Sequence, residues 1–425
     1  MDATDKFRNI IEKYKTPLFV YDRDIILSKI EDMKQTIGEN FEIVYSMKAN
    51  PNPVLLQLFH SSNLLFEVAS SGELSLLLNC GIAPEKILFA GPGKTADELK
   101  FCVDKKILSI NVESMREIAT LETICSEQNT NVDICLRINI NLDSIANRRE
   151  LNWFSTSKFG IDEHCLDEIV VFLRSHKRVR CIGLHVHMAS NVTNHEILTE
   201  YLFAICHQII NIMDKFKITL KIVNFGGGWG NPNYLGEREL DSYNLRQTYK
   251  KIAYLLKNSK INGRMLVESG RYLIGSAGYY IADIVDIKER ANKNIIVING
   301  GINHMLFLSS AFRIRGKQIP IGYIRKNKKC SKREVSAKKI YEIGGSLCTP
   351  IDYMANHAEL PSDLKPGDYL VFTNAGAYTK MASPLNFLGH DWPSEVLLSH
   401  GEGHLIASPI SLNDIISLQN RLQQD

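Results

Sequence analysis

The strongest constraint on the fold is a regular alternation of short, β-rich runs with longer segments of helical period between Phe41 and Glu268. Eight runs are predicted to be strands, namely Glu42–Met47, Leu64–Ala69, Ile87–Ala90, Leu108–Val112, Val132–Ile140, Cys181–His187, Leu220–Phe225 and Met265–Glu268. Helices are predicted between them, among them Ser71–Cys80, Thr95–Asp104 and His195–Phe216. Buried strands joined by helices indicate a parallel sheet. Eight such units fit a closed (β/α)8 barrel better than an open doubly wound sheet.

Beyond Tyr272 the pattern changes to short apolar runs separated by Gly, Pro, Asn and Asp. These runs are Tyr279–Val285, Asn294–Ile298 and Tyr369–Thr373. They predict a second, mostly antiparallel β domain, and the strand-like segment Pro17–Tyr21 is expected to join it. We therefore expect a barrel over residues 25–275 and a sandwich-like or barrel-like β domain formed by residues 1–24 and 276–425.

Composition narrows the functional classes. The chain has 50 Lys+Arg and 47 Asp+Glu, a net charge of +3, which argues against a dedicated nucleic-acid or membrane-surface binder. The polar segment Met1–Lys6 does not resemble a secretory signal, and no run approaches the ~20 apolar residues of a membrane span. The nine cysteines include no close pair, so we expect reduced thiols in a soluble, cytoplasmic protein.

Polar residues mark the ends of several predicted strands, where a barrel of this kind places its chemistry. They are Lys48, Glu67, His185 with His187, Gly226–Gly228, and Glu268–Tyr272. Lys48 is either a lysine that reaches to solvent or, if desolvated in the barrel mouth, a nucleophile that forms a Schiff base with an aldehyde. The glycine run is either a tight turn or a backbone site for an anion.

Charge pairs at these strand ends have two interpretations. Arg271 and Glu268 either pair with each other or serve a ligand, with Arg271 on a phosphate and Glu268 on a pyridine nitrogen that it keeps protonated. His185 and His187 point to the same side of their strand, and each is either a core histidine or a ring that lies flat on a cofactor. A metal site is the weaker interpretation, because no third ligand follows at a recognisable spacing.

Together these groups suit pyridoxal 5′-phosphate, which needs an amine for its aldehyde, a phosphate site and a partner for its ring nitrogen. The chain resembles the fold-type III, alanine-racemase-like decarboxylases, which include diaminopimelate and ornithine decarboxylases. The motifs that carry the resemblance are Tyr-Ser-Met-Lys48-Ala-Asn, Phe-Glu-Val-Ala-Ser-Ser-Gly-Glu73, Gly91-Pro-Gly-Lys-Thr95, Leu-Arg137-Ile-Asn, Lys158-Phe-Gly-Ile, His185-Val-His187-Met-Ala-Ser190, Gly226-Gly-Gly228, Glu268-Ser-Gly-Arg271-Tyr, Cys348 and Gly376-Ala-Tyr378.

The resemblance implies specific roles. Lys48 would bind the aldehyde, His187 would stack on the ring, and Glu268 would face the pyridine nitrogen, which favours decarboxylation over racemisation. The remaining cofactor residues would be Glu67, Ser190, Gly227, Gly228, Gly270, Arg271 and Tyr378. Relatives of this kind are homodimers, so the partner subunit would supply Cys348, which would protonate Cα. No metal is expected.

Two departures from the diaminopimelate and ornithine decarboxylase pattern concern the substrate. Thr349 follows Cys348 where those enzymes have an acid for a distal amine, and Phe387–His390 replaces an aromatic-Asn-Gly sequence. In both features the chain resembles a branch of the family that acts on conjugated amino acids in siderophore and antibiotic biosynthesis. Arg313 and Arg315 would then receive an extra carboxylate or phosphate, or would simply lie on the surface.

The run Arg325–Lys339 contains eight basic residues and one acid, and it is either a solvated loop or a docking patch for an acidic carrier protein. The leading hypothesis is a pyridoxal-phosphate-dependent decarboxylase of an amino acid or amino-acid conjugate, free or linked to a carrier. One alternative is diaminopimelate decarboxylase of lysine biosynthesis. Another is a non-catalytic regulator that keeps the fold, although retention of Lys48, Glu268, Arg271 and Cys348 argues against it.

Overall fold

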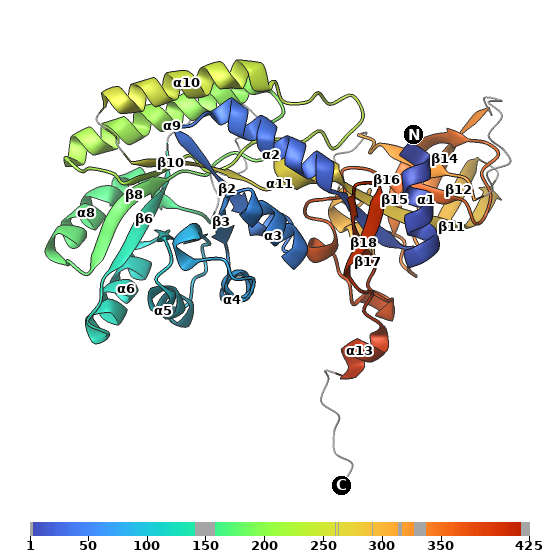
Figure 1. Cartoon of the computed structure of the whole chain (residues 1–425), viewed down its shortest axis with the longest axis horizontal. Helices are drawn as coiled ribbons and strands as arrows, with labels where there is room; N and C mark the ends of the chain where they lie inside the picture. Colours follow the sequence, from blue (N-terminus) through green and yellow to red (C-terminus); the bar gives the residue numbers. More distant parts are fainter. Residues whose placement is uncertain are drawn as a thin grey trace, which may run out of the picture. The chain divides into compact units, whose positions relative to one another are not determined.

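The computed structural model describes residues 3–140, 158–259, 261, 263–290, 292–312, 317–326 and 337–417 (Figure 1). The chain forms two compact units. The barrel unit consists of Ser28–Asn231 and Arg238–Leu273, and the β unit consists of Met1–Leu27, Pro232–Glu237 and Ile274–Asp425. In the part of the chain described, no helix is both long and apolar enough to span a membrane.

The barrel unit contains a closed ring of parallel strands, as the alternating sequence pattern predicts. Its strands are β2 (Phe41–Ser46), β3 (Leu65–Val68), β4 (Ile87–Phe89), β5 (Ser109–Val112), β6 (Val132–Asn139), β8 (Val179–His185), β9 (Ile222–Asn224) and β10 (Arg264–Ser269). They follow the order β5-β4-β3-β2-β10-β9-β8-β6, and pairing between β5 and β6 closes the ring. The two-residue strand β7 (Ile161–Asp162) adds to β6.

The barrel closes around an apolar layer to which most of its strands contribute one side chain. This layer consists of Val44, Leu65, Leu88, Cys135, Ile182, Ile222 and Leu266. Gly183 on β8 permits the close approach of its neighbours, since a Cβ there would lie 2.5 Å from the Ile222 carbonyl oxygen. Because helices cover the opposite face, the strands are buried on both sides and read as almost uninterrupted apolar runs.

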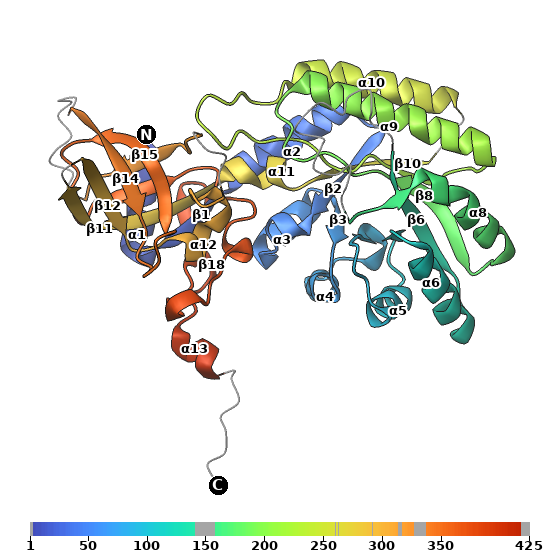
Figure 2. The same cartoon turned by 180° about the vertical axis from the view of Figure 1, so that it is seen from behind.

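Helices surround the strands, and both views show α9 beside α10 (Figures 1 and 2). They are α2 (Arg23–Ile37), α3 (Pro53–Ser61), α4 (Ser71–Asn79), α5 (Ala96–Lys105), α6 (Met115–Glu127), α8 (Leu166–Ser175), α9 (His195–Phe216), α10 (Ser242–Asn258) and α11 (Arg271–Ile274). Several begin at a capping side chain: Thr95 and Glu98 form a reciprocal capping box on α5, and Asn194 caps α9. The predicted bounds of α9 are confirmed, and those of α4 and α5 differ by one residue.

The β unit is mostly antiparallel, as predicted. Its elements are α1 (Ala3–Tyr14), β1 (Leu18–Asp22), β11 (Gly278–Arg290), β12 (Lys293–Ile298), α12 (Ile302–Met305), β13 (Ile321–Ile324), β14 (Lys338–Gly344), β15 (Tyr353–Pro361), β16 (Tyr369–Phe372), β17 (Ser394–Ser399), β18 (Glu402–Ala407) and α13 (Leu412–Ser417). Strand β1 pairs with β11 and β17, so the segment before the barrel does join this sheet. The pairs β1–β17 and β12–β14 are parallel.

Candidate active site

Lys48 lies immediately beyond β2, within the single 3-10 turn Met47–Ala49 that the Asn50 N–H closes onto the Met47 carbonyl. The predicted strand, Glu42–Met47, therefore begins and ends one residue later than β2, Phe41–Ser46. Lys48 Nζ donates to Glu67 Oε1 at 2.8 Å, and the lysine side chain keeps 40% of its area exposed. The amine is thus partly exposed, and a carboxylate accompanies it.

Glu67 is the penultimate residue of β3 and is 3% exposed. Burial raises its pKa from 4.5 to about 7, and the nearby charge of Glu268 adds to this effect, while Lys48 opposes it. Ser46 Oγ also donates to Glu67, at 3.3 Å from Oε2. A carboxyl group that gains and loses its proton near neutral pH therefore lies against the candidate nucleophilic amine.

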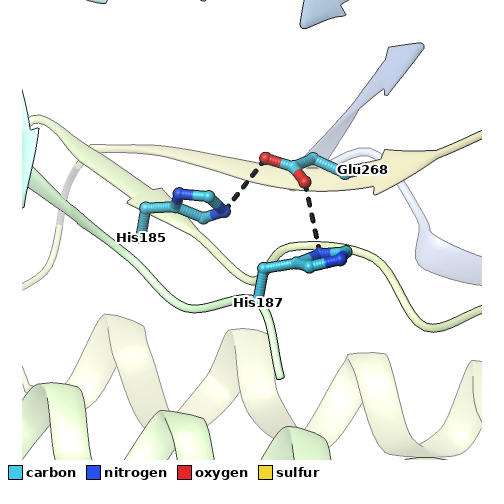
Figure 3. Close-up of side chains that lie close together, drawn as sticks. All are labelled: His185, His187 and Glu268. Carbon is cyan, nitrogen blue, oxygen red and sulfur yellow. Dashed lines mark ion pairs between the residues drawn. The ribbon is translucent and has the colours of Figure 1, made fainter. Parts of the chain in front are cut away.

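Glu268 on β10 is the centre of a buried polar group (Figure 3). Asn224 Nδ2 donates to its Oε1 at 2.8 Å, and His185 Nε2 lies 3.1 Å from the same oxygen. Burial alone would raise the pKa of Glu268, but the neighbouring His185 acts most strongly in the opposite direction, and the pKa is held well below 4.5. Glu268 is therefore a carboxylate, the state required beside a protonated pyridine nitrogen.

His187 is positioned by the glycine turn as well as by its own strand. The Gly227 N–H donates to His187 Nδ1 at 2.8 Å, so Nδ1 carries a lone pair and the ring proton belongs on Nε2. Burial lowers the pKa of His187 to about 4, which makes the imidazole neutral at pH 7. The 3.4 Å approach of Nδ1 to Glu268 Oε2, dashed in Figure 3, is then a contact between two acceptors.

Side-chain acceptors explain where β8 ends. The strand spans Val179–His185, two residues short of its predicted end. Val186 N–H still bonds to the Asn224 carbonyl, but the Gly226 N–H bonds to the Asn224 side chain and the Gly227 N–H to the His187 ring, so neither continues the pairing with a strand carbonyl. Both histidines nonetheless approach the same carboxylate, as their alternation predicts.

The glycines of the candidate phosphate site have steric reasons to be glycine. Gly226 and Gly228 have φ of +62° and +128°, and a Cβ on Gly227 would lie 3.0 Å from His187 Cε1. A Cβ on Gly270 would lie 2.8 Å from the Ala49 methyl group, beside the Lys48 turn. Arg271 begins α11 directly after β10, and an exposed Ser190 follows β8.

His185, His187 and Glu268 bring possible metal-ligand atoms within 4.8 Å of one another. The third ligand that the sequence lacks at a local spacing thus comes from β10. However, His187 Nδ1 already accepts the Gly227 N–H and Glu268 Oε1 already accepts the Asn224 amide. The group is therefore better described as a carboxylate held by its neighbours than as a vacant coordination sphere.

A second buried ionic group lies farther round the barrel. Glu113, just after β5, accepts Arg137 Nη1 at 2.9 Å and the N–H groups of Gly91 and Gly160 at 3.1 and 2.9 Å. The Arg137 guanidinium also lies 4.6 Å from the centre of the Phe159 ring. This group ties together the segments that follow β4 and β5, strand β6 itself and the residue before β7, and sequence reasoning assigned it no function.

The β unit supplies the other predicted residues. Cys348 is exposed, and Thr349 follows it in a tight turn in which the Asp352 N–H bonds to the Thr349 carbonyl. Tyr378 has φ of +55° and lies in a loop whose Ala375 and Gly376 N–H groups bond to Gly278 and Gly275.

Two predictions for the substrate and a partner concern residues that are only partly described. Arg313 and Arg315 lie outside the described residues, as does 327–336 of the basic run. The described ends of that run pair with acids of the same unit: Arg325 with Asp363, Lys338 with Glu359 and Lys339 with Glu289. These ends resemble a solvated, internally neutralised surface.

Sequence reasoning missed two contacts that define the site, Lys48 with Glu67 and Asn224 with Glu268. Asn224 is a polar residue at the end of a predicted strand, directly before Phe225 and the glycine turn. Its position at a strand end could have marked it as a candidate site residue.

Comparison with known proteins assigns the chain to a family. Residues 23–275 match the family model described as pyridoxal-dependent decarboxylase, pyridoxal binding domain. A protein of Niallia circulans described as L-glutamyl-[BtrI acyl-carrier protein] decarboxylase is 30% identical over 413 residues, which are 96% of this chain and 95% of the relative. The diaminopimelate decarboxylase of Campylobacter jejuni is 26% identical and covers 98% of both chains.

Solved structures agree on the fold. The diaminopimelate decarboxylase of M. jannaschii in complex with L-lysine aligns with a TM-score of 0.86 at 24% identity, over 96% of this chain and 93% of that one. The enzyme of Helicobacter pylori complexed with L-lysine gives 0.84 at 24% identity, over 97% and 98%. With a family model that spans more than half its length, the chain belongs to the pyridoxal-dependent decarboxylases.

Proposed function

We propose that this decarboxylase acts on an amino acid whose distal end is already joined to a larger group, such as a carrier protein or the scaffold of a siderophore or antibiotic. Its products would be CO2 and the corresponding amine. The Cys348 loop carries the argument, because it offers no carboxylate for the distal ammonium of a free diamino acid.

The acidic residue nearest to Cys348 in the following sequence is not available to a substrate. Thr349 follows Cys348, and the next acid along the chain is Asp352. Asp352 is only 3% exposed, and its two carboxylate oxygens accept the N–H groups of Ile302 and Leu347, both at 2.8 Å. A carboxylate committed to two buried N–H groups is a poor partner for a substrate ammonium. The description of the Niallia circulans relative supports a carrier-linked substrate.

The candidate residues fit pyridoxal phosphate by the chemistry of their donors. Lys48 would hold the aldehyde, Glu268 the ring nitrogen and His187 the ring face. The phosphate would be held by Ser190, Gly227, Gly228, Gly270, Arg271 and Tyr378. When bound, the cofactor supplies an electron sink for the electrons left on Cα as the carboxylate departs.

The chain's own residues would manage the protons. Lys48 must lose and regain protons as substrate enters and product leaves, and Glu67, 2.8 Å away with a pKa of about 7, can accept and return them. Glu268 would keep its negative charge, because His185 and the Asn224 amide stabilise the carboxylate. Cys348 would deliver the final proton to Cα.

We also propose a homodimer in which the partner subunit supplies Cys348. Cys348 is exposed, and so are Ile351, Phe307 and Phe312 of the same unit, at 59%, 46% and 58%. Mixing inactive Lys48→Ala and Cys348→Ala proteins should restore about a quarter of wild-type activity, because random exchange gives each mixed dimer one intact site. Absence of restoration after demonstrated subunit exchange would contradict shared sites.

The reaction compartment is proposed to be the cytoplasm. The cysteines within the described residues are free thiols, and four of them, Cys102, Cys125, Cys135 and Cys206, are buried. Unpaired thiols support a reducing compartment.

The substrate proposal is tested by comparing kcat/KM for a glutamyl carrier-protein thioester with that for meso-diaminopimelate, lysine and ornithine. We expect the conjugate to be preferred by about a hundredfold or more. Thr349→Glu should raise turnover of the diamino acids by restoring an acid, whereas the matched Thr349→Gln should not. Efficient turnover of meso-diaminopimelate by the wild-type enzyme would instead favour the lysine-pathway alternative.

A further inference from the structure

Asn224 occupies the last position of β9, and its side chain is completely buried. Its backbone is fixed on both sides, because it pairs with His185 of β8 and with Leu266 of β10. The side chain therefore projects from a rigid strand end between the candidate ring-nitrogen carboxylate and the glycine turn.

The two ends of the Asn224 amide have different partners. Nδ2 donates to Glu268 Oε1 at 2.8 Å, and Oδ1 accepts the Gly226 N–H at 2.9 Å. The Gly226 N–H can only donate, so it fixes which end of the amide is oxygen. The NH2 group must then point to Glu268, where it requires an oxygen that accepts.

The orientation of the Asn224 amide affects both Glu268 and the glycine turn. An NH2 group against Glu268 favours the ionised carboxyl group over the protonated one. Acceptance of the Gly226 N–H fixes the first residue of a turn whose second residue, Gly227, in turn orients His187. One amide thus connects the carboxylate, the glycine turn and the imidazole.

We propose that Asn224 is a positioning residue that sets the ring-nitrogen end and the phosphate end of the cofactor site together. This inference rests on the proposed function, since it assigns the cofactor to the same residues. It adds a residue outside the family motifs described above and states what each end of its amide does.

Two variants separate the two ends. Asn224→Asp keeps an oxygen for the Gly226 N–H but places a second carboxylate oxygen against Glu268, so only the Glu268 contact is lost. Asn224→Ala removes both contacts. The control is Asn111→Ala, which removes another fully buried asparagine, on β5, whose amide has no hydrogen-bond partner within the described part of the chain.

The measurements are made on protein reconstituted with pyridoxal phosphate. For Asn224→Asp we expect kcat to fall about tenfold or more, the pH dependence of the cofactor absorption band to shift, and the cofactor dissociation constant to change less than about threefold. For Asn224→Ala the cofactor dissociation constant should also rise about tenfold. In a Glu268→Gln background, Asn224→Asp should add little to the loss, since its target carboxylate is gone.

The outcomes are distinguishable. Wild-type kcat and an unshifted absorption titration in Asn224→Asp would overturn the link to Glu268, and unchanged cofactor affinity in Asn224→Ala would overturn the link to the glycine turn. If Asn224→Ala does not fold by circular dichroism, Asn224→Ser tests the same contact. A wild-type protein that binds no cofactor would overturn the proposed function and this inference with it, whereas a normal wild type with indifferent variants overturns this inference alone.

Discussion

Asp352 offers a direct test of how the Cys348 loop is held. Its Oδ1 accepts the Ile302 N–H and its Oδ2 accepts the Leu347 N–H, both at 2.8 Å. Glycines make room for the carboxylate, because Cβ atoms on Gly301 and Gly345 would lie 2.4 and 2.2 Å from its oxygens. Substitution of Asp352 should therefore loosen two segments that are distant in sequence.

The size of the effect follows from the two hydrogen bonds. Asn has nearly the same shape as Asp but only one oxygen, so Asp352→Asn leaves one buried N–H facing an NH2 group, at a cost of about 1–3 kcal/mol. Asp352→Ala leaves both N–H groups without an acceptor and should cost about 2–6 kcal/mol. Burial raises the pKa of Asp352. The cost of burying the Asp352 charge therefore offsets part of the stability that its two hydrogen bonds contribute.

Hydrogen exchange measured by mass spectrometry reports on these amides directly. Peptides that contain Ile302 and Leu347 should exchange about tenfold faster or more in Asp352→Ala, and denaturant unfolding should show the matching loss of stability. Asp363→Asn is the control, because Asp363 is 49% exposed and its pairing with Arg325 should contribute less than about 1 kcal/mol. Unchanged exchange at both amides in Asp352→Ala would show that the Asp352 carboxylate does not hold these two segments.

Three further predictions concern the barrel and the proton donor. The pKa of Glu67 is about 7 in the folded protein and near 4.5 in the unfolded chain, so the folded state holds this proton to higher pH. The free energy of unfolding of the cofactor-free protein should therefore fall as the pH rises between these values, by at most about 3 kcal/mol. Between about pH 5 and pH 7.5, Glu67→Gln should show a smaller change in the free energy of unfolding than the wild type. Glu113→Ala should lower the free energy of unfolding by about 3–5 kcal/mol, measured by thermal unfolding, because it leaves Arg137 buried without its carboxylate. Asp133→Ala, which breaks an exposed ion pair, should cost less than about 1 kcal/mol. Equal losses in the two variants would contradict this account. Cys348→Ala should slow Cα protonation and yield a by-product beside the amine, and an unchanged rate and product ratio would remove that role from the thiol.

Local sequence patterns predicted much of the secondary structure. Helix α9 has its predicted bounds because Asn194 caps one end and Lys217, with φ of +54°, ends the other. The barrel strands were predictable because burial on both faces makes them apolar throughout. Strand ends were less accurate where side chains interrupt the backbone pairing, as Asn224 and His187 do after β8.

The succession of strands and helices, and the places of Lys48, His187 and Glu268 near strand ends, can be predicted from periodicity and from residue types along the chain. Which side chains meet depends on how the strands pair. Ser46 of β2 pairs with Glu67 of β3, which brings Glu67 to Lys48. Asn224 pairs with His185 of β8 and Leu266 of β10, which brings Asn224 to Glu268. Strand register depends on packing around the closed barrel, and so do the protonation states of Glu67, His187 and Glu268, because burial and neighbouring charges set them.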